Sequence, residues 1–352
     1  MKSELGRRSR HRLLRGLIAA LIALAWGFPI AALAVPVSYY EDLVGGNISG
    51  TLNGVPFANS YLFLSFTGDT ATTIPFSITG ASGYENLTGS ATFQILDANF
   101  NTIGAGNFLP DAGIFISVDN TNGGIGFGSF GLPPWDPNFP PPTVIYPGAV
   151  LVPCNVTPNV VTYDLQSDAF FADYQLGCVG FPGTCQPGLP LSTDQGVLTV
   201  DQITVGSGYF QTQTSPVTAM SALKASVAVS ASPAAPAGGT PLNHFQVKAS
   251  VSLDNSRGGV DPLTEPVTLQ LAHYRVTIPA GSFHGSRQSG YHFHGDIHGV
   301  ALHVSLTPDS SGGYSVEADG AGAAVPPLAN PLYVRLTLGH HAGRTMVNVA
   351  RP

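Results

Sequence analysis

Four histidines and an aspartate crowd the stretch SGYHFHGDIHGVALHV, which runs from Ser289 to Val304. Imidazole nitrogens and carboxylate oxygens are ligands that Zn²⁺, Ni²⁺ and Cu²⁺ accept in proteins. Alternate side chains of a β-strand lie on the same face of a sheet. The spacing therefore puts several of these groups side by side if the stretch folds as a β-hairpin.

A two-residue turn at His298 and Gly299 predicts such a hairpin with one preferred register. Its inward pairs are all apolar or glycine, which favours this register over a slipped one. These pairs are Ile297 with Val300, Gly295 with Leu302, Phe293 with Val304, and Tyr291 with Leu306.

The same register pairs His294 with His303 on the outward face, with Cβ atoms about 5 Å apart. The flanking outward pairs are His292 with Ser305 and Asp296 with Ala301.

The outward residues His292, His294, His303 and Asp296 form the predicted metal set, for zinc, nickel or copper. The two opposed imidazoles would supply two ligands, and His292 or Asp296 a third. The alternative interpretation is a solvated polar face, because a flat strand face rarely brings three ligands together without a loop. Both interpretations stay open on the sequence, and no other cofactor is expected.

The first 34 residues have the features of a secretory signal peptide. A basic segment precedes an uncharged apolar run from Gly16 to Ala34, and Ala32-Leu33-Ala34 fits a small-x-small cleavage site. An uncleaved anchor is the alternative, since a bilayer span needs about 20 apolar residues, but the helix-breaking Pro29 favours cleavage before Val35. We expect a secreted, extracellular or cell-surface protein, with the periplasm as a further compartment, and no membrane span in the mature chain.

The composition is typical of an all-β extracellular protein. The 352 residues are 43% hydrophobic and only 10% charged, with 42 Gly and 29 Pro. Residues 35–215 carry 13 acidic and no basic side chains, whereas 222–352 carry seven acidic and eight basic ones. A first half with a net charge of −13 argues against nucleic acid or an anionic membrane as partner. A surface protein or a glycan remains the partner class to consider.

Alternating strand patterns between turn signals predict two antiparallel β-sandwich domains. We expect a signal peptide over 1–34, an acidic sandwich over 35–213, a linker over 214–221 and a histidine-containing sandwich over 222–352. In the first sandwich, Asn-Gly in GTLNGVPF predicts a hairpin turn. In the second, the expected strands are 223–230, 244–253, 266–271, 273–278, 291–297, 300–306, 313–319, 332–338 and 344–350.

Two sets of phrases resemble known classes of protein. SGTLNGVPFANSYLFLSFTGDTAT looks like the opening of a β-rich module in secreted bacterial proteins, many of which carry a C-terminal PEP-type sorting signal; this chain instead ends TMVNVARP. GGVDPLTEPVTLQL, VTIPAGSF, FHGDIHGVALHV and NPLYVRLTLGHHAGRT together resemble a β-sandwich module, often repeated in tandem, in uncharacterised secreted bacterial proteins. The resemblance implies a fold and an export route, and no activity.

Three further groups of residues could carry a role. Cys178 and Cys185 enclose the loop CVGFPGTC and predict a disulfide in an oxidising compartment, while Cys154 stays free or pairs with one of them. The Pro-rich stretch GLPPWDPNFPPPTVIYPG contains three aromatic residues, Trp135, Phe139 and Tyr146. They could stack on sugar rings or fold back over the sandwich. DANFNT, from Asp97, opens like a calcium loop but lacks its Gly and Glu, which favours a polar turn.

The sequence contains no G-x-S-x-G, H-E-x-x-H or P-loop motif. We therefore expect no catalytic activity. The favoured function is an exported structural or adhesive interaction protein of the cell surface or extracellular space. A metal-binding protein and a carbohydrate-binding or carbohydrate-active protein are the alternatives.

Overall fold

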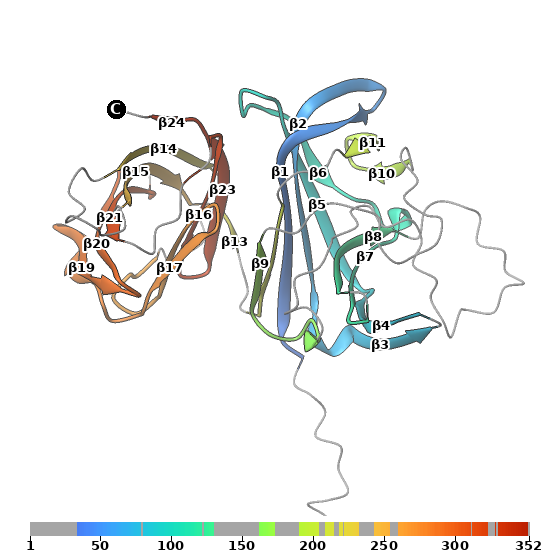
Figure 1. Ribbon diagram of the computed structural model, residues 1–352, viewed down its shortest axis with the longest axis horizontal. Coiled ribbons are helices and arrows are strands. Elements are labelled where there is room, and N and C mark those ends of the chain that lie inside the picture. Colours follow the sequence, from blue (N-terminus) through green and yellow to red (C-terminus); the bar gives the residue numbers. More distant parts are fainter. Residues whose placement is uncertain are drawn as a thin grey trace, which may run out of the picture. The chain divides into compact units, whose positions relative to one another are not determined.

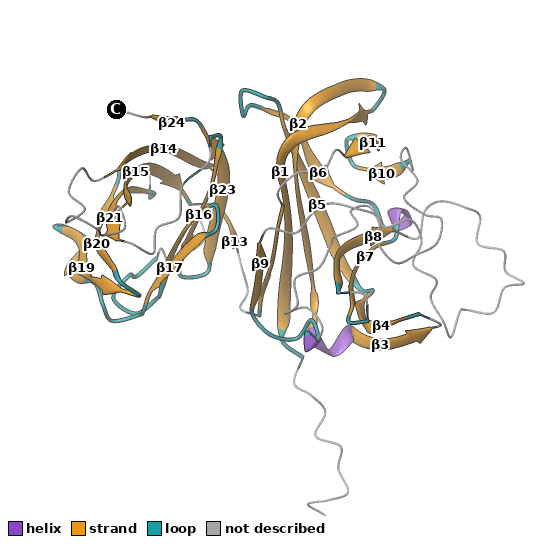
Figure 2. Ribbon diagram, in the orientation of Figure 1, coloured by secondary structure: helices purple, strands orange, loops and turns teal. Residues whose placement is uncertain are grey.

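The computed structural model describes residues 34–78, 80–121, 123–129, 162–172, 190–203, 208–214, 218–220, 222–231, 243–253, 260–310, 312–322, 328 and 330–350. The chain divides into a segment over Met1–Val35 and a compact unit over Pro36–Pro352, and the elements below belong to the second. Figure 1 labels most of them, and Figure 2 shows how few of the described residues are helical.

The all-β prediction is confirmed. Across the described ranges the strands form four sheets, antiparallel except for two short parallel pairs, and the two helices are 3-10 turns at Thr70–Thr72 and Pro110–Ala112. In this part of the chain no helix has the length and apolar character needed to cross a membrane.

A long hairpin organises the first half of the unit. β1 (Pro36–Leu52) and β2 (Val55–Asp69) are joined by Asn53 and Gly54, whose φ angles of 51° and 76° form the turn that Asn-Gly predicts. Within the described residues these strands belong to an eight-stranded sheet with the order β10-β11-β1-β2-β5-β6. β12 pairs with the first part of β1, and β9 pairs with β12. The other strands are β10 (Leu191–Thr193), β11 (Gly196–Ile203), β5 (Gly89–Leu96), β6 (Thr102–Asn107), β12 (Gly208–Gln213) and β9 (Ala169–Ala172).

One face of the eight-stranded sheet shares a core with a four-stranded sheet, in the order β3-β4-β7-β8. Its strands are β3 (Thr73–Ile78), β4 (Ala81–Asn86), β7 (Ile114–Asp119) and β8 (Gly124–Ser129). Tyr39, Leu43 and Phe66 from the larger sheet and Phe127 from β8 are completely buried there. Burying a side chain of this size contributes about 1.5–3 kcal/mol, so this core holds the two sheets together.

The second half of the unit contains a five-stranded and a seven-stranded sheet within the described residues. The five-stranded sheet has the order β13 (Thr218–Ala219), β23 (His341–Val347), β22 (Leu332–Leu338), β16 (Val267–Leu271), β17 (Tyr274–Ile278). The seven-stranded sheet has the order β18 (His284–Ser286), β19 (Gly290–Ile297), β20 (Val300–Pro308), β21 (Tyr314–Gly322), β15 (Asn243–Ser252), β14 (Ala222–Ala231), β24 (Val349–Ala350).

The two sheets of the second half bury a common core that includes Phe245, Leu271, Leu306 and Leu332. Every strand range predicted for 222–352 overlaps an observed strand, and the short β18 is additional. β13 occupies part of the range predicted as a linker. The division of the unit into two sandwich domains stays a prediction.

All seven residues of β22 are buried, including Arg335 and Thr337. A strand at the edge of a core usually buries only alternate residues. Here Val334 and Leu336 enter the core of the second half, whereas Tyr333 contacts Phe63 and Tyr209 of the eight-stranded sheet. β22 therefore lies between two packed layers and is buried on both faces.

Candidate functional site

The histidine hairpin has the predicted register. β19 and β20 pair Ile297 with Val300, and the opposed outward pair is His294 with His303. The centroids of these two imidazole rings are 5.8 Å apart, and the ring planes are inclined by 70°. Both side chains are exposed, because the apolar residues that alternate with them along each strand point into the core.

The turn of the hairpin fixes the direction of Asp296. His298 and Gly299 have φ angles of 53° and 79°, the left-handed backbone of a tight two-residue turn. Asp296 Oδ1 accepts a hydrogen bond from the Gly299 backbone N–H at 3.0 Å. This carboxylate is engaged in closing the turn.

Histidines continue across the outer face of the seven-stranded sheet. His292 pairs with His284 on β18, and His303 lies opposite Asp319 on β21. The carboxylate of Asp319 is in turn 3.1 Å from His244 Nε2 on β15. The exposed face of this sheet is therefore a polar surface rich in histidine.

The predicted metal set is brought together only in part. His294 and His303 face each other, His292 lies along the same strand opposite Ser305, and Asp296 bonds to the turn. Within the ranges that the structure describes, no group of three or more His, Cys, Asp or Glu side chains is arranged to hold a metal ion. Metal binding by this hairpin stays a prediction.

The predicted cysteine and aromatic sites lie outside the described residues: Cys154, Cys178, Cys185, Trp135, Phe139 and Tyr146. The loop from Asp97 is the polar turn that its sequence favours. Asp97 Oδ1 accepts hydrogen bonds from the backbone N–H groups of Asn99 and Asn101, at 2.8 and 2.9 Å. The bonds from Asn101 lower the pKa of Asp97 below its ordinary value.

A buried ionic cluster was not expected from the sequence. Alternation along β1 sends Asp42 away from the core of the first half, and its carboxylate is completely buried. Arg344 Nη1 on β23 lies 2.6 Å from Asp42 Oδ1, and the hydroxyl of Tyr333 donates to the other carboxylate oxygen. Burial and the adjacent Asp42 charge raise the pKa of Tyr333 far above its ordinary value. The tyrosine therefore stays protonated and remains a donor.

A second buried cation lies beside this cluster. Arg335 is 3% exposed, and its guanidinium carbon is 4.1 Å from the centroid of the Tyr40 ring. Its Nη2 donates to Gln213 Oε1 at 2.7 Å, while its Nη1 has no hydrogen-bond partner among the described residues. Gln211 Nε2 also donates to Gln270 Oε1 at 2.5 Å, so polar contacts link β12 to the five-stranded sheet.

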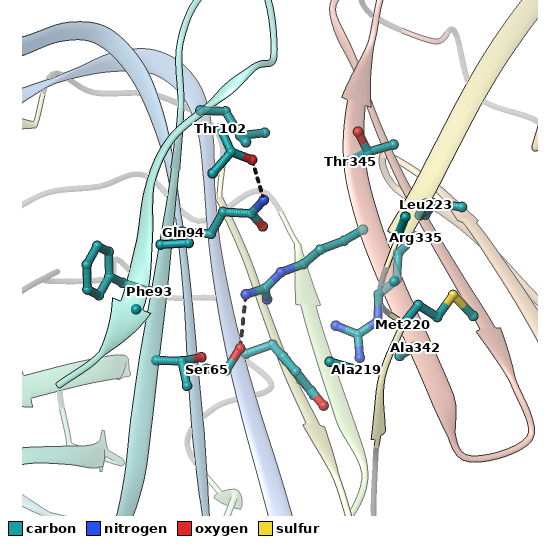
Figure 3. A pocket seen from close by; sticks show the side chains of 18 of the residues that line it. Ser65, Phe93, Gln94, Thr102, Ala219, Met220, Leu223, Arg335, Ala342 and Thr345 are labelled. Atoms are coloured by element: carbon teal, nitrogen blue, oxygen red, sulfur yellow. Dashed lines mark hydrogen bonds between the residues drawn. The ribbon is translucent and has the colours of Figure 1, made fainter. Parts of the chain in front are cut away.

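These arginines form part of the wall of a cavity of about 770 Å³. Figure 3 shows the side chain of Arg335 on one side of it, and Gln94 and Thr102 on the other. Most of the remaining lining residues come from β2, β5, β6, β13, β14 and β23, and Tyr40 of β1 and the turn at Asp194 and Gln195 also contribute. The cavity therefore lies among strands that are distant in the sequence.

One sequence signal could have pointed to this region. Arg335 is the only charge in the strand LYVRLTL, and Glu41-Asp42 interrupts the apolar and aromatic start of β1. A charge inside an apolar strand either faces solvent or meets a buried partner. Which of these holds depends on the packing of separate sheets.

Among the residues that the structure describes, those that could act chemically lie in two places. One is the exposed histidine pair at His294 and His303, and the other is the cavity beside the buried arginines. Comparison of the chain with family models, with curated proteins and with solved structures gives no match.

Proposed function

We propose that this protein is exported and acts as a non-catalytic structural or adhesive interaction protein at the cell surface or in the extracellular space. The signal-peptide pattern of residues 1–34 supports export. The observation that carries the interaction role is the buried ionic contact of Asp42 with Arg344 and Tyr333.

This contact supports the proposal because burying two charges costs free energy that apolar side chains would not. Two charges buried together are rarely more stable than apolar side chains of the same volume. The ion pair is more specific in geometry than an apolar contact, because an ion pair with a shared hydrogen bond permits one arrangement of its strands. The fixed arrangement supports the proposal, because a rigid unit can hold a bound partner in a set position.

Cell fractionation tests the proposal. The full chain, made at low level in a bacterial host, should yield a product that begins at Val35 and appears in the envelope or medium. The purified product should bind saturably to envelopes of its source strain. The matched variant Asp42→Asn/Arg344→Met keeps the side-chain volume but not the ion pair, and it should bind less while staying folded. A full-length product confined to the cytoplasm, or no saturable binding, would overturn the proposal.

A second candidate function is metal binding at the hairpin, which the opposed pair His294 and His303 favours. Two neutral imidazoles at this separation can share Zn²⁺, Ni²⁺ or Cu²⁺, with water in the other positions. Metal analysis of the untagged protein should then show one of these metals, absent from His294→Ala/His303→Ala and retained in the control His273→Ala. Metal missing from the wild type, with unchanged melting after zinc is added, would rule this function out.

A further inference from the structure

The cavity near Arg335 has features of a ligand site that the proposed function does not use. Its volume of about 770 Å³ falls in the range that holds small organic molecules. Its walls come mainly from β2, β5 and β6 on one side and from β13, β14, β22 and β23 on the other, with Tyr40 of β1 and the turn at Asp194 and Gln195 also contributing (Figure 3). A pocket between separately formed sheets is a common place for such a ligand.

The charges around the cavity favour an anion. Lys224, Arg335 and Arg344 all contribute to its lining. Because Arg344 is already paired with Asp42, Lys224 and Arg335 are the cations left to attract a ligand. Asp194 is the acid among the described lining residues, and both its carboxylate oxygens accept hydrogen bonds from Asn107, at 2.9 and 2.6 Å. Cations in excess at a concave, partly enclosed surface attract a negatively charged group.

Arg335 supplies the specific observation. Its side chain is buried, with only 3% of the residue's surface exposed. Its Nη1 has no hydrogen-bond partner within the described chain. A buried guanidinium N–H without an acceptor is costly, and native proteins rarely leave one so. A carboxylate is the acceptor that best matches the guanidinium group, and pairing is strong where water is kept away.

The other lining residues suit a ligand that carries many hydroxyl groups. Gln94 Nε2 donates to Thr102 Oγ1 at 3.0 Å, and both side chains are exposed at that contact. Phe100, a non-glycine residue with a φ of 67°, also lines the cavity. The turn closed by Asp97 places it there, with its ring 5.5 Å from that of Tyr61. Amide and hydroxyl groups bind sugar hydroxyls, and an aromatic side chain packs on the apolar face of a sugar ring.

We propose that this cavity binds a carboxylate-bearing sugar, either as a free uronic acid or as the terminal unit of an acidic polysaccharide. The carboxylate pairs with Arg335 and Lys224. The hydroxyl groups meet the amide and hydroxyl side chains of β5 and β6, and the ring lies against Phe100. This site goes beyond the proposed function, because binding of the sugar does not depend on where the protein works.

Titration calorimetry on the purified, untagged protein tests the site, with glucuronate, glucose and a short oligo-uronate as probes. Glucose has a hydroxymethyl group in place of the carboxylate. We expect glucuronate to bind about tenfold or more tightly than glucose, as a charge-assisted hydrogen bond requires. Tighter binding of the oligo-uronate would identify a polysaccharide end, and equal binding a free sugar.

Variants connect the binding to the named residues. Lys224→Ala should weaken glucuronate several-fold, whereas Lys248→Ala, an exposed lysine paired with Glu317 on the histidine-rich face, should leave it unchanged. Arg335→Lys keeps the charge but not the fork of donors and should weaken it further, provided that its melting temperature is preserved. If Arg335→Lys does not fold, Lys224→Ala alone decides.

The site is overturned if glucuronate gives no saturable heat at millimolar concentration, or if glucose binds equally well. It is also overturned if Lys224→Ala binds glucuronate as the wild type does. None of these outcomes bears on export or on envelope binding, so the proposed function would survive them.

Discussion

At the scale of single residues, this protein buries several of its few ionisable side chains. Glu85 on β4 is 1% exposed, and neither of its carboxylate oxygens has a hydrogen-bond partner among the described residues. Burial raises the pKa of Glu85 to about 7. The folded protein therefore holds a proton here that the unfolded chain releases.

The stability of the wild type should fall as the pH rises from about 4.5 to 7, the interval between the unfolded and folded pKa values of Glu85. Below that interval both states are protonated, and above it both are ionised, so the contribution becomes constant. Glu85→Gln removes the titration and should be about 2–3 kcal/mol more stable than the wild type at pH 8. Urea unfolding at pH 4.5 and 8 measures this, and equal pH dependence in both proteins would contradict it.

The sequence could not reveal which charges are buried. Glu85 follows a tyrosine in a Gly- and Asn-rich stretch, as a surface turn residue would. Asp42 and Arg344 are about three hundred positions apart, and only the packing of separate sheets makes them a pair. Burial of a polar residue is a property of tertiary structure, and local patterns do not encode it.

At the scale of elements, the histidine hairpin was the most predictable part of the molecule. Its two strands alternate strictly, so a slip of one residue would expose Phe293 and Val304 and bury His294. The His298-Gly299 turn adds a second, independent constraint on the register. β18 was missed because three exposed residues, one of them Gly285, carry no alternation of apolar and polar side chains.

The turn itself should be sensitive to backbone conformation. A Cβ added at Gly299 would meet no other atom within 4 Å, so Gly299→Ala tests only the cost of a left-handed φ, about 1 kcal/mol in free energy of unfolding. His298→Asn should be neutral or stabilising, because asparagine accepts a left-handed backbone more readily. Chemical denaturation of both variants measures the difference. A Gly299→Ala protein as stable as the wild type would contradict this account of the turn.

At the scale of the whole unit, separate sheets are held by a few polar groups that are shielded from water. Arg344 contacts Asp42, donates to Ser65 Oγ at 3.0 Å, and lies 5.1 Å from the centroid of the Phe63 ring. Removal of one partner leaves the other charge buried and unpaired. The contact should therefore respond very differently to single and to double substitution.

Asp42→Ala should lower the free energy of unfolding by about 3–5 kcal/mol, since it strands the Arg344 charge and the Tyr333 hydroxyl. Asp42→Asn/Arg344→Met should recover all but about 1 kcal/mol of that loss. Urea unfolding at pH 7 measures both values. A double variant that loses as much stability as Asp42→Ala, or more, would contradict the coupling of the two side chains.

The sequence predicted the all-β class and the strand pattern of 222–352, but not the four-stranded sheet of the first half. Its strands include GIGFGS and ASGYEN, where glycines obscure the alternation. Nor could the cavity be predicted, because residues from both ends of the chain line it. Periodicity indicates which face of a strand is apolar, and the sheet that covers this face is decided by long-range packing.

The position of β1 has a consequence for the order of events during synthesis. Tyr39 pairs with Thr212, and Thr51 pairs with Thr199, so the first strand to be made lies beside strands made much later. At translation rates of about 5–20 residues per second, one edge of β1 stays unpaired for on the order of ten seconds or more. Such an edge recruits other chains. A chaperone that shields the nascent chain until residue 213 emerges should therefore raise the yield of folded protein. The long-range pairing of β1 also makes the folding of the protein slow.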